Sequence, residues 1–200
     1  MTPRRSDRRI ERTRKQLREA LIELMIKKGY EGTTVQDIID RANVGRATFY
    51  AHFADKHALL ESGLENLRLL LTSGETTPPQ PLGFSLPMLE HAHGHLPLYR
   101  SLVGRHSGGF VIRRIQEIIA ELVLRDFKAQ GSSGGSDQTA LAARFVSGAF
   151  MSVLTWWLEG GAKLTPREVD EIFRRLVTRG VYGEPGTKLP PLGPRAARSG

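Results

Sequence analysis

The sequence contains no cysteine, which excludes disulfides and thiolate metal sites. It also has no uninterrupted apolar run of the roughly 18 residues that a membrane-spanning helix needs. Its N-terminus is polar and rich in arginine and lacks the apolar core of a secretory signal. We therefore expect a cytoplasmic protein with no membrane partner. A Gly-rich phosphate loop, a nucleophile elbow and a pair of spaced carboxylates are all missing, which argues against an enzyme.

The composition is that of a globular, basic protein. The chain has 200 residues, of which 40% are hydrophobic, and this is enough for a sizeable core. Its net charge of +8 favours an anionic partner, although the same charge would also serve solubility alone. Apolar residues recur at three- and four-residue spacing, with no sustained alternation of two. The pattern predicts an all-α fold of about nine helices.

The stretch from residue 33 to residue 56 is the most informative part of the chain. Its first half has apolar residues on one face of a short helix, which Thr33 or Thr34 would cap. Asn43 tolerates the left-handed conformation that ends such a helix. Gly45 and the residue after it begin a second short helix with a polar outer face. Two short helices joined by a tight turn form a helix-turn-helix, whose second helix enters the major groove of DNA.

The rest of the chain divides around this stretch. Residues 1–9 form a basic arm that either tracks DNA, in the minor groove or along phosphates, or is a solvated terminus. The helix before the stretch ends near Lys28, and a linking helix after it runs from Lys56 to about Leu71. We expect a DNA-binding domain at 1–54, a helical domain at 55–182 and a disordered tail at 183–200. Further helices are expected at about 85–94, 96–103, 110–129, 138–159 and 166–181.

The order of these elements resembles that of the TetR/AcrR (tetracycline-repressor) family of bacterial regulators. The run TTVQDIIDRANVGRATFYAHFADKHALL, residues 33–60, carries the resemblance, and Thr-Phe-Tyr-x-His-Phe-x-x-Lys is its most specific part. The resemblance implies an N-terminal three-helix helix-turn-helix domain and a C-terminal helical ligand-binding and dimerisation domain. It also implies a double-stranded DNA operator and repression that a small-molecule effector relieves.

The same resemblance assigns candidate DNA contacts. Arg46 has a planar fork suited to guanine O6 and N7, and the methyl group of Ala47 or Thr48 could meet a thymine methyl. Hydroxyl, imidazole and ammonium groups suit phosphate oxygens. The alternative is that Tyr50 and His52 pack locally and that Lys56 is a solvated lysine. The expected base contacts are Gly45, Arg46, Ala47 and Thr48, and the expected phosphate contacts are Thr34, Tyr50, His52 and Lys56.

Dimerisation and ligand binding are expected in the helical body. A helix-turn-helix grips one half-site weakly, so we expect a homodimer through the helices at about 138–159 and 166–181. The first of these has more apolar surface than one core requires, although a wholly intramolecular core helix remains the alternative. The effector pocket is expected among the middle helices, although ordinary core is the simpler interpretation of each candidate. The candidates are Leu89, Tyr99, Leu102, Phe110, Ile115, Ile119, Phe150 and Trp157.

His91, His93 and His95 suggest a metal site, but only Glu90 stands beside them as a carboxylate. A solvated polar face is the simpler interpretation, and we expect no metal and no cofactor. Two other functions compete with a ligand-responsive regulator. One is a regulator that answers to a protein co-regulator, whose body would be tightly packed without a cavity. The other is an enzyme that uses the histidine cluster.

Overall fold

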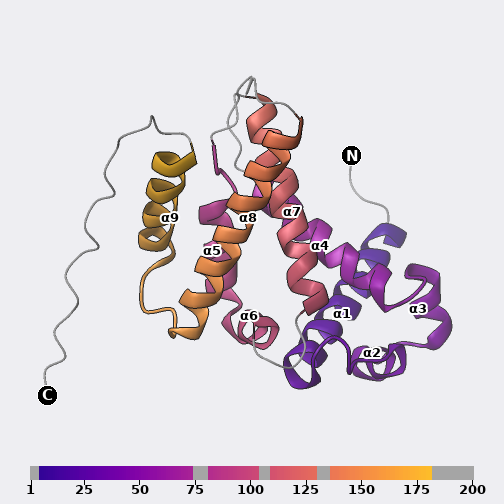
Figure 1. The fold of residues 1–200 in the computed structure, drawn as a ribbon. Helices are drawn as coiled ribbons and strands as arrows, with labels where there is room; N and C mark the ends of the chain where they lie inside the picture. Colours follow the sequence, from indigo (N-terminus) through magenta and orange to yellow (C-terminus); the bar gives the residue numbers. More distant parts are fainter. Residues whose placement is uncertain (1–4, 74–80, 104–108, 130–135, 182–200) are drawn as a thin grey trace, which may run out of the picture.

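The computed structural model describes residues 5–73, 81–103, 109–129 and 136–181, and within these ranges every regular element is an α-helix (Figure 1). The all-α fold predicted from the sequence is therefore confirmed. The tail expected at 183–200 lies outside the described residues. The helices are α1 (Arg5–Lys28), α2 (Val35–Ala42), α3 (Arg46–His52), α4 (Lys56–Thr72), α5 (Ser85–Gly94), α6 (Leu96–Val103), α7 (Gly109–Ala129), α8 (Ser136–Glu159) and α9 (Pro166–Val181).

Helices α1, α2 and α3 lie together at one end of the molecule (Figure 1). The buried side chains of Leu17, Ile38 and Phe49 come one from each helix and join a common core. α1 begins at Arg5, so the segment 1–9 that was expected as a basic arm is helical from that residue onward. The part of the arm that precedes Arg5 lies outside the described residues.

α4 connects this end to the body of the molecule. The Asp55 carboxylate caps it by accepting a hydrogen bond of 2.7 Å from the backbone N–H of Ala58. Leucines on one face of α4, among them Leu59 and Leu64, are buried against the rest of the core. α4 contacts both α1 and α5, so it directly connects the helix-turn-helix end to the body.

The body is built on two pairs of helices: α8 lies along α7, and α9 packs on α5 (Figure 1). A buried polar network secures the second pair. Asp170 accepts hydrogen bonds from the Ser85 hydroxyl and from the Arg174 guanidinium. Arg174 also donates to the carbonyls of Pro81 and Leu82, at 2.9 and 2.6 Å. The segment before α5 is thereby held against α9, and every buried charge in this network has a partner.

α8 is the most apolar helix among the described residues. By length and composition alone it could span a membrane, although polar residues interrupt its apolar sequence. Such a helix is also typical of a globular core, and 44% of its most apolar window is buried within the protein. Its buried side chains, such as Val146, Phe150 and Leu154, belong to the same core as those of α7 and α9.

Candidate nucleic-acid interface

A reciprocal cap fixes the start of α2. The Thr34 hydroxyl oxygen accepts from the backbone N–H of Asp37 at 3.2 Å, while the Asp37 carboxylate accepts from the Thr34 backbone N–H at 2.7 Å and from the Thr34 hydroxyl. The Lys28 ammonium, 2.7 Å from the same carboxylate, together with Thr34 holds the pKa of Asp37 well below its usual range. Thr33 is buried and donates to the Gly29 carbonyl, so Thr34 is the cap.

The turn after α2 has the geometry expected from the sequence. Asn43 adopts the left-handed conformation with φ 51° and ψ 51°, and the backbone N–H of Val44 donates to the Ile39 carbonyl at 3.2 Å. Gly45 is extended and precedes the first residue of α3. On its inner face α3 buries Phe49 completely, and Phe53 follows it into the core. The opposite face of this seven-residue helix is therefore turned outward.

The four expected base-contact residues, Gly45, Arg46, Ala47 and Thr48, are all exposed. The guanidinium carbon of Arg46 lies 5.7 Å from the centroid of the Tyr50 ring, and its Nη1 is 3.5 Å from the side-chain oxygen of Gln36 on α2. The Arg46 side chain therefore contacts a residue of α2 as well as a residue of its own helix, α3. The structure thus brings the predicted residues together on one continuous outer face.

The expected phosphate contacts do not form one group. The Tyr50 side chain is exposed and His52 is half-buried, so both are available at the surface. The hydroxyl proton of Thr34 is already donated to Asp37 at 2.5 Å. The helix cap therefore uses both the N–H and the hydroxyl proton of Thr34. The side chains of Tyr50 and His52 take part in no helix cap.

Lys56 has a role that the sequence did not indicate. Its ammonium donates to the backbone carbonyls of Tyr30, Glu31 and Thr33 at 3.1, 3.4 and 2.9 Å. It also lies 4.6 Å from the centroid of the Tyr30 ring. An ammonium has three protons, and all three are used by the α1–α2 loop. This geometry argues against the expected phosphate contact and for a structural tie between that loop and the start of α4.

Tyr30 is the centre of a junction between the DNA-binding end and the body. Its hydroxyl lies 2.8 Å from Nδ1 of His57, and its ring stacks on Phe110 at a centroid distance of 5.7 Å. His57 in turn meets the edge of Phe110 at 5.2 Å. The three residues come from the α1–α2 loop, from α4 and from α7. Neither partner is near Tyr30 in the chain, so the sequence did not indicate this junction.

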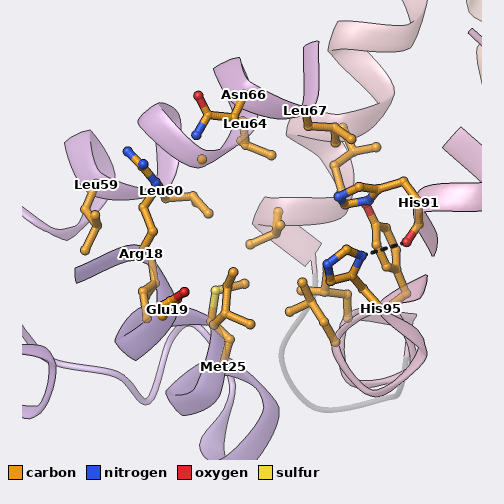
Figure 2. A pocket seen from close by; sticks show the side chains of 18 of the residues that line it. Arg18, Glu19, Met25, Leu59, Leu60, Leu64, Asn66, Leu67, His91 and His95 are labelled. Carbon is orange, nitrogen blue, oxygen red and sulfur yellow. Dashed lines mark hydrogen bonds between the residues drawn. The ribbon is translucent and has the colours of Figure 1, made fainter. Parts of the chain in front are cut away.

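A cavity of about 470 Å³ lies beside this junction, between α1, α4, α5, α6 and α7 (Figure 2). α1 supplies an unexpected share of its wall through Arg18, Leu21, Ile22 and Met25. The residues predicted to line the pocket included none from α1. The sequence signal for this wall is the width of the apolar face of α1, because Ile22 and Ile26 are apolar too and remain partly exposed.

Only part of the predicted pocket lines this cavity: Tyr99, Leu102 and Ile115 do. The other five predicted residues do not line this cavity, because their side chains pack elsewhere. Phe110 stacks on Tyr30, and Phe150 packs between Phe84 and Phe173. The indole N–H of Trp157 donates to the carbonyl of Leu164 at 2.9 Å. Leu89 and Ile119 are fully buried core residues.

Two of the three histidines lie at one end of the cavity (Figure 2). Nδ1 of His91 is 2.9 Å from the hydroxyl of buried Tyr99, and the His95 ring stacks on the His91 ring at 4.4 Å. Burial, with a smaller contribution from His95, lowers the pKa of His91 to about 4, so His91 is neutral at pH 7. His93 faces away and stacks on Trp157. Within the described residues, no group of three or more potential ligands could hold a metal ion.

The fold and this surface define a class of protein: an all-α protein with a helix-turn-helix at one end and a cavity whose wall includes α1 of that end. Comparison with known families agrees with that class. Residues 17–62 match the family of bacterial regulatory proteins named tetR, and residues 80–179 match a transcriptional regulator C-terminal region. The chain belongs to the tetR family of bacterial regulatory proteins, whose members are regulators and not enzymes.

Individual relatives and structures are consistent with this assignment. An uncharacterised HTH-type transcriptional regulator of Bacillus subtilis, YxbF, is 29% identical over 82% of this chain. The match covers only 43% of the length of YxbF. The HTH-type transcriptional repressor KstR of Mycobacterium tuberculosis is 27% identical over 82% of this chain and 80% of its own length. A TetR regulator structure from Streptococcus agalactiae superposes with a TM-score of 0.65 at 24% identity, covering 86% of this chain and 97% of that one, and shows the shared fold.

Proposed function

We propose that this protein is a cytoplasmic, dimeric, sequence-specific DNA-binding repressor that a small molecule releases from its operator. One observation carries the proposal: helix α1 packs on the helix-turn-helix and also forms a wall of the cavity. A ligand in the cavity would therefore touch the DNA-binding end directly. The repressing direction is supported by the similarity to KstR, which is named as a transcriptional repressor.

The contacts with DNA follow from the exposed face of α3. Arg46 would donate two hydrogen bonds to a guanine, while Ala47 and the Thr48 methyl group would meet thymine methyls. Tyr50 and His52 would hold phosphates beside the groove. Lys56 acts indirectly in this scheme, because its ammonium positions the α1–α2 loop.

The dimer would form through α8 and α9. Large apolar side chains of α8 remain exposed, and they recur at intervals of four and eleven residues, so they share one helical face. Phe145 and Trp156 are 60% and 62% exposed. A surface of this kind on a single chain marks an interface. The exposed apolar residues of the two helices are Leu141, Phe145, Trp156, Ile172 and Leu176.

Release would come from a change in the distance between the two recognition helices. A dimer reads half-sites about 34–36 Å apart, so a shift of a few ångström at each α3 weakens binding. A ligand can cause this only if it binds better to the shifted arrangement. The cavity walls from α1 and α4 are the parts that would move. Control by a protein co-regulator predicts a body without such a cavity, so the small-molecule mechanism is favoured.

The test is selection of bound fragments from genomic DNA by the full-length protein, with its oligomeric state measured by light scattering. We expect enrichment of an inverted repeat whose half-site centres are about one helical turn, 10–10.5 base pairs, or a multiple of it apart. We also expect the particle that binds it to contain an even number of chains. Absence of any enriched sequence would refute the DNA-binding role, and an enriched site bound by a monomer would refute the dimer.

A further inference from the structure

The cavity has a charged end and an uncharged end, which identifies the class of molecule it would hold. Its middle is lined by leucines and other apolar side chains from α1, α4, α6 and α7. A volume of about 470 Å³ lies within the range of about 300–1,000 Å³ that is usual for small-molecule sites. An elongated apolar body fits such walls, because each buried CH₂ group contributes about 0.8 kcal/mol.

The charged end belongs to α1. Arg18 is partly buried, lines the cavity and extends from α1 toward α4 near Leu60 and Asn66 (Figure 2). Among the described residues its guanidinium has no hydrogen bond or ion pair, whereas Arg14, one turn earlier on the same helix, approaches Glu11 at 3.9 Å. Lys15 and Glu19 stand at the same edge and form a weak pair with each other at 3.7 Å. The remaining positive charge at this edge is that of Arg18.

The uncharged end is the histidine pair. The ring N–H at Nδ1 of His95 donates to the backbone carbonyl of His91 at 2.9 Å, because a carbonyl can only accept. The other ring nitrogen, Nε2, faces the cavity (Figure 2). His91 has its Nδ1 engaged by Tyr99 and is neutral at pH 7. This end offers hydrogen bonds but no built anion site, so an anionic group would go to Arg18.

We propose that the cavity binds an amphipathic carboxylate, with its carboxylate on the Arg18 guanidinium and its apolar chain among the leucines toward His95. This inference rests on the proposed ligand-controlled function and names the class of effector. Arg18 suits the role because its planar fork matches a carboxylate with two parallel hydrogen bonds. The bound carboxylate would tie α1 to the contents of the cavity, while the chain would press on α4.

Gly63 provides a way to close the cavity without disturbing the fold. It lies in the middle of α4 and lines the cavity, and a Cβ atom built on it meets no heavy atom within 4 Å. A leucine at this position would occupy the space meant for the chain of the ligand. The change also favours the helix, since glycine is about 1 kcal/mol less favourable than alanine in a helix interior.

The experiment measures binding of decanoate and of decan-1-ol to the full-length protein by isothermal titration calorimetry, with no DNA present. Both probes have the same chain, so their difference reports the carboxylate. We expect decanoate to bind about ten- to a hundredfold more tightly than decanol. Arg18→Gln should abolish that preference, whereas Arg12→Gln, an exposed arginine of α1 outside the cavity, should retain it. Gly63→Leu should abolish binding of both probes.

Equal affinity for the two probes, or binding of neither, would overturn the proposal. A preference for decanoate that survives Arg18→Gln, or decanoate binding that survives Gly63→Leu, would also overturn it by placing the ligand elsewhere. Circular dichroism of each variant establishes that it is folded before titration. The DNA selection described above is scored separately, so a regulator whose cavity rejects carboxylates is distinguished from a protein that does not bind DNA.

Discussion

The hydroxyl of Tyr30 lies 2.8 Å from Nδ1 of His57, and this contact joins the α1–α2 loop to the first turn of α4. Burial, with smaller contributions from the nearby acidic residues Glu31, Asp55 and Glu61, raises the pKa of Tyr30 to about 12. The ring of Phe110 stacks on the ring of Tyr30. The orientation of the loop that precedes the helix-turn-helix therefore depends on residues from the body.

Removing only this hydroxyl should weaken the junction. We expect Tyr30→Phe to lower the free energy of unfolding by about 1 kcal/mol, because the ring still stacks but the His57 hydrogen bond is lost. Urea denaturation at pH 7 measures the change, and Tyr50→Phe, at an exposed tyrosine, should show none. The raised pKa means that the native protein loses this stabilisation as pH rises from about 10 to about 12. The gap between wild type and Tyr30→Phe should narrow over that interval, and a constant gap would contradict the assignment.

Lys56 should affect stability more than DNA contact. We expect Lys56→Met to lower the free energy of unfolding by about 1–3 kcal/mol, because three carbonyls lose their donor. The DNA affinity of Lys56→Met should depend on salt concentration as the affinity of the wild type does. A direct phosphate contact would instead reduce the slope of log K against log salt by about 0.9. Lys27→Met, at an exposed lysine of α1, is the matched control for stability.

Arg46 should carry specificity at one base pair. We expect Arg46→Ala to make affinity insensitive to the base at that position, with a loss of about 1–3 kcal/mol of discrimination. The measurement is fluorescence anisotropy on the selected operator and its single-base variants. Arg100→Ala, an exposed arginine of α6, should leave the preference intact. A uniform loss on every sequence would assign Arg46 to phosphate contact instead.

The cap of α2 should fail in acid. Lys28 and Thr34 lower the pKa of Asp37, so its contribution to stability is fully present above the ordinary aspartate pKa near 4 and is lost as pH falls below it. We therefore expect Asp37→Asn to lower the thermal unfolding midpoint at pH 7, and we expect its difference from wild type to be smaller at pH 3. Calorimetry at both pH values tests this. A difference that is the same at both would show that the charge of Asp37 is not what stabilises the helix start.

The exposed apolar face of α8 should hold the dimer together. We expect Phe145→Glu to weaken dimerisation by about 2 kcal/mol or more, because a charge would be buried in the interface. The exposed position of Phe145 means that the fold of each chain should survive. Sedimentation over a range of concentrations measures the change. Leu69→Glu, at an apolar residue of α4 that is 58% exposed, is the control and should leave the association unchanged. If Phe145→Glu also associates like the wild type, α8 is not part of the interface.

Local patterns were enough to predict most of the helices and their ends. The bounds of α5 and α6 agree with those expected, because Gly94 ends the first helix and Pro97 is tolerated only in the first turn of the second. Asn43 adopts the left-handed conformation that its residue type allows. At the N-terminus the prediction was less accurate: residues 1–9 resemble a solvated arm, with the helix expected from about Arg8, yet α1 already begins at Arg5 because arginine is itself a good helix former.

The cavity and the junction could not be predicted in this way. An apolar residue on a helix face is equally suited to core and to pocket, and only the positions of neighbouring helices decide which it becomes. Phe150 and Tyr99 are both buried aromatic residues, but Phe150 lies between Phe84 and Phe173, whereas Tyr99 lines the cavity. The division of the chain at residues 54 and 182 remains a prediction.

The sequence by itself determined the helical class, the helix-turn-helix and the outward face of α3, because these depend on residues within a few turns of one another. Only the tertiary structure decided that Lys56 serves three carbonyls, that Tyr30 meets His57 and Phe110, and that α1 forms a wall of the cavity. Those contacts join residues far apart in the chain. Their existence depends on how the helices pack, which no short stretch of sequence encodes.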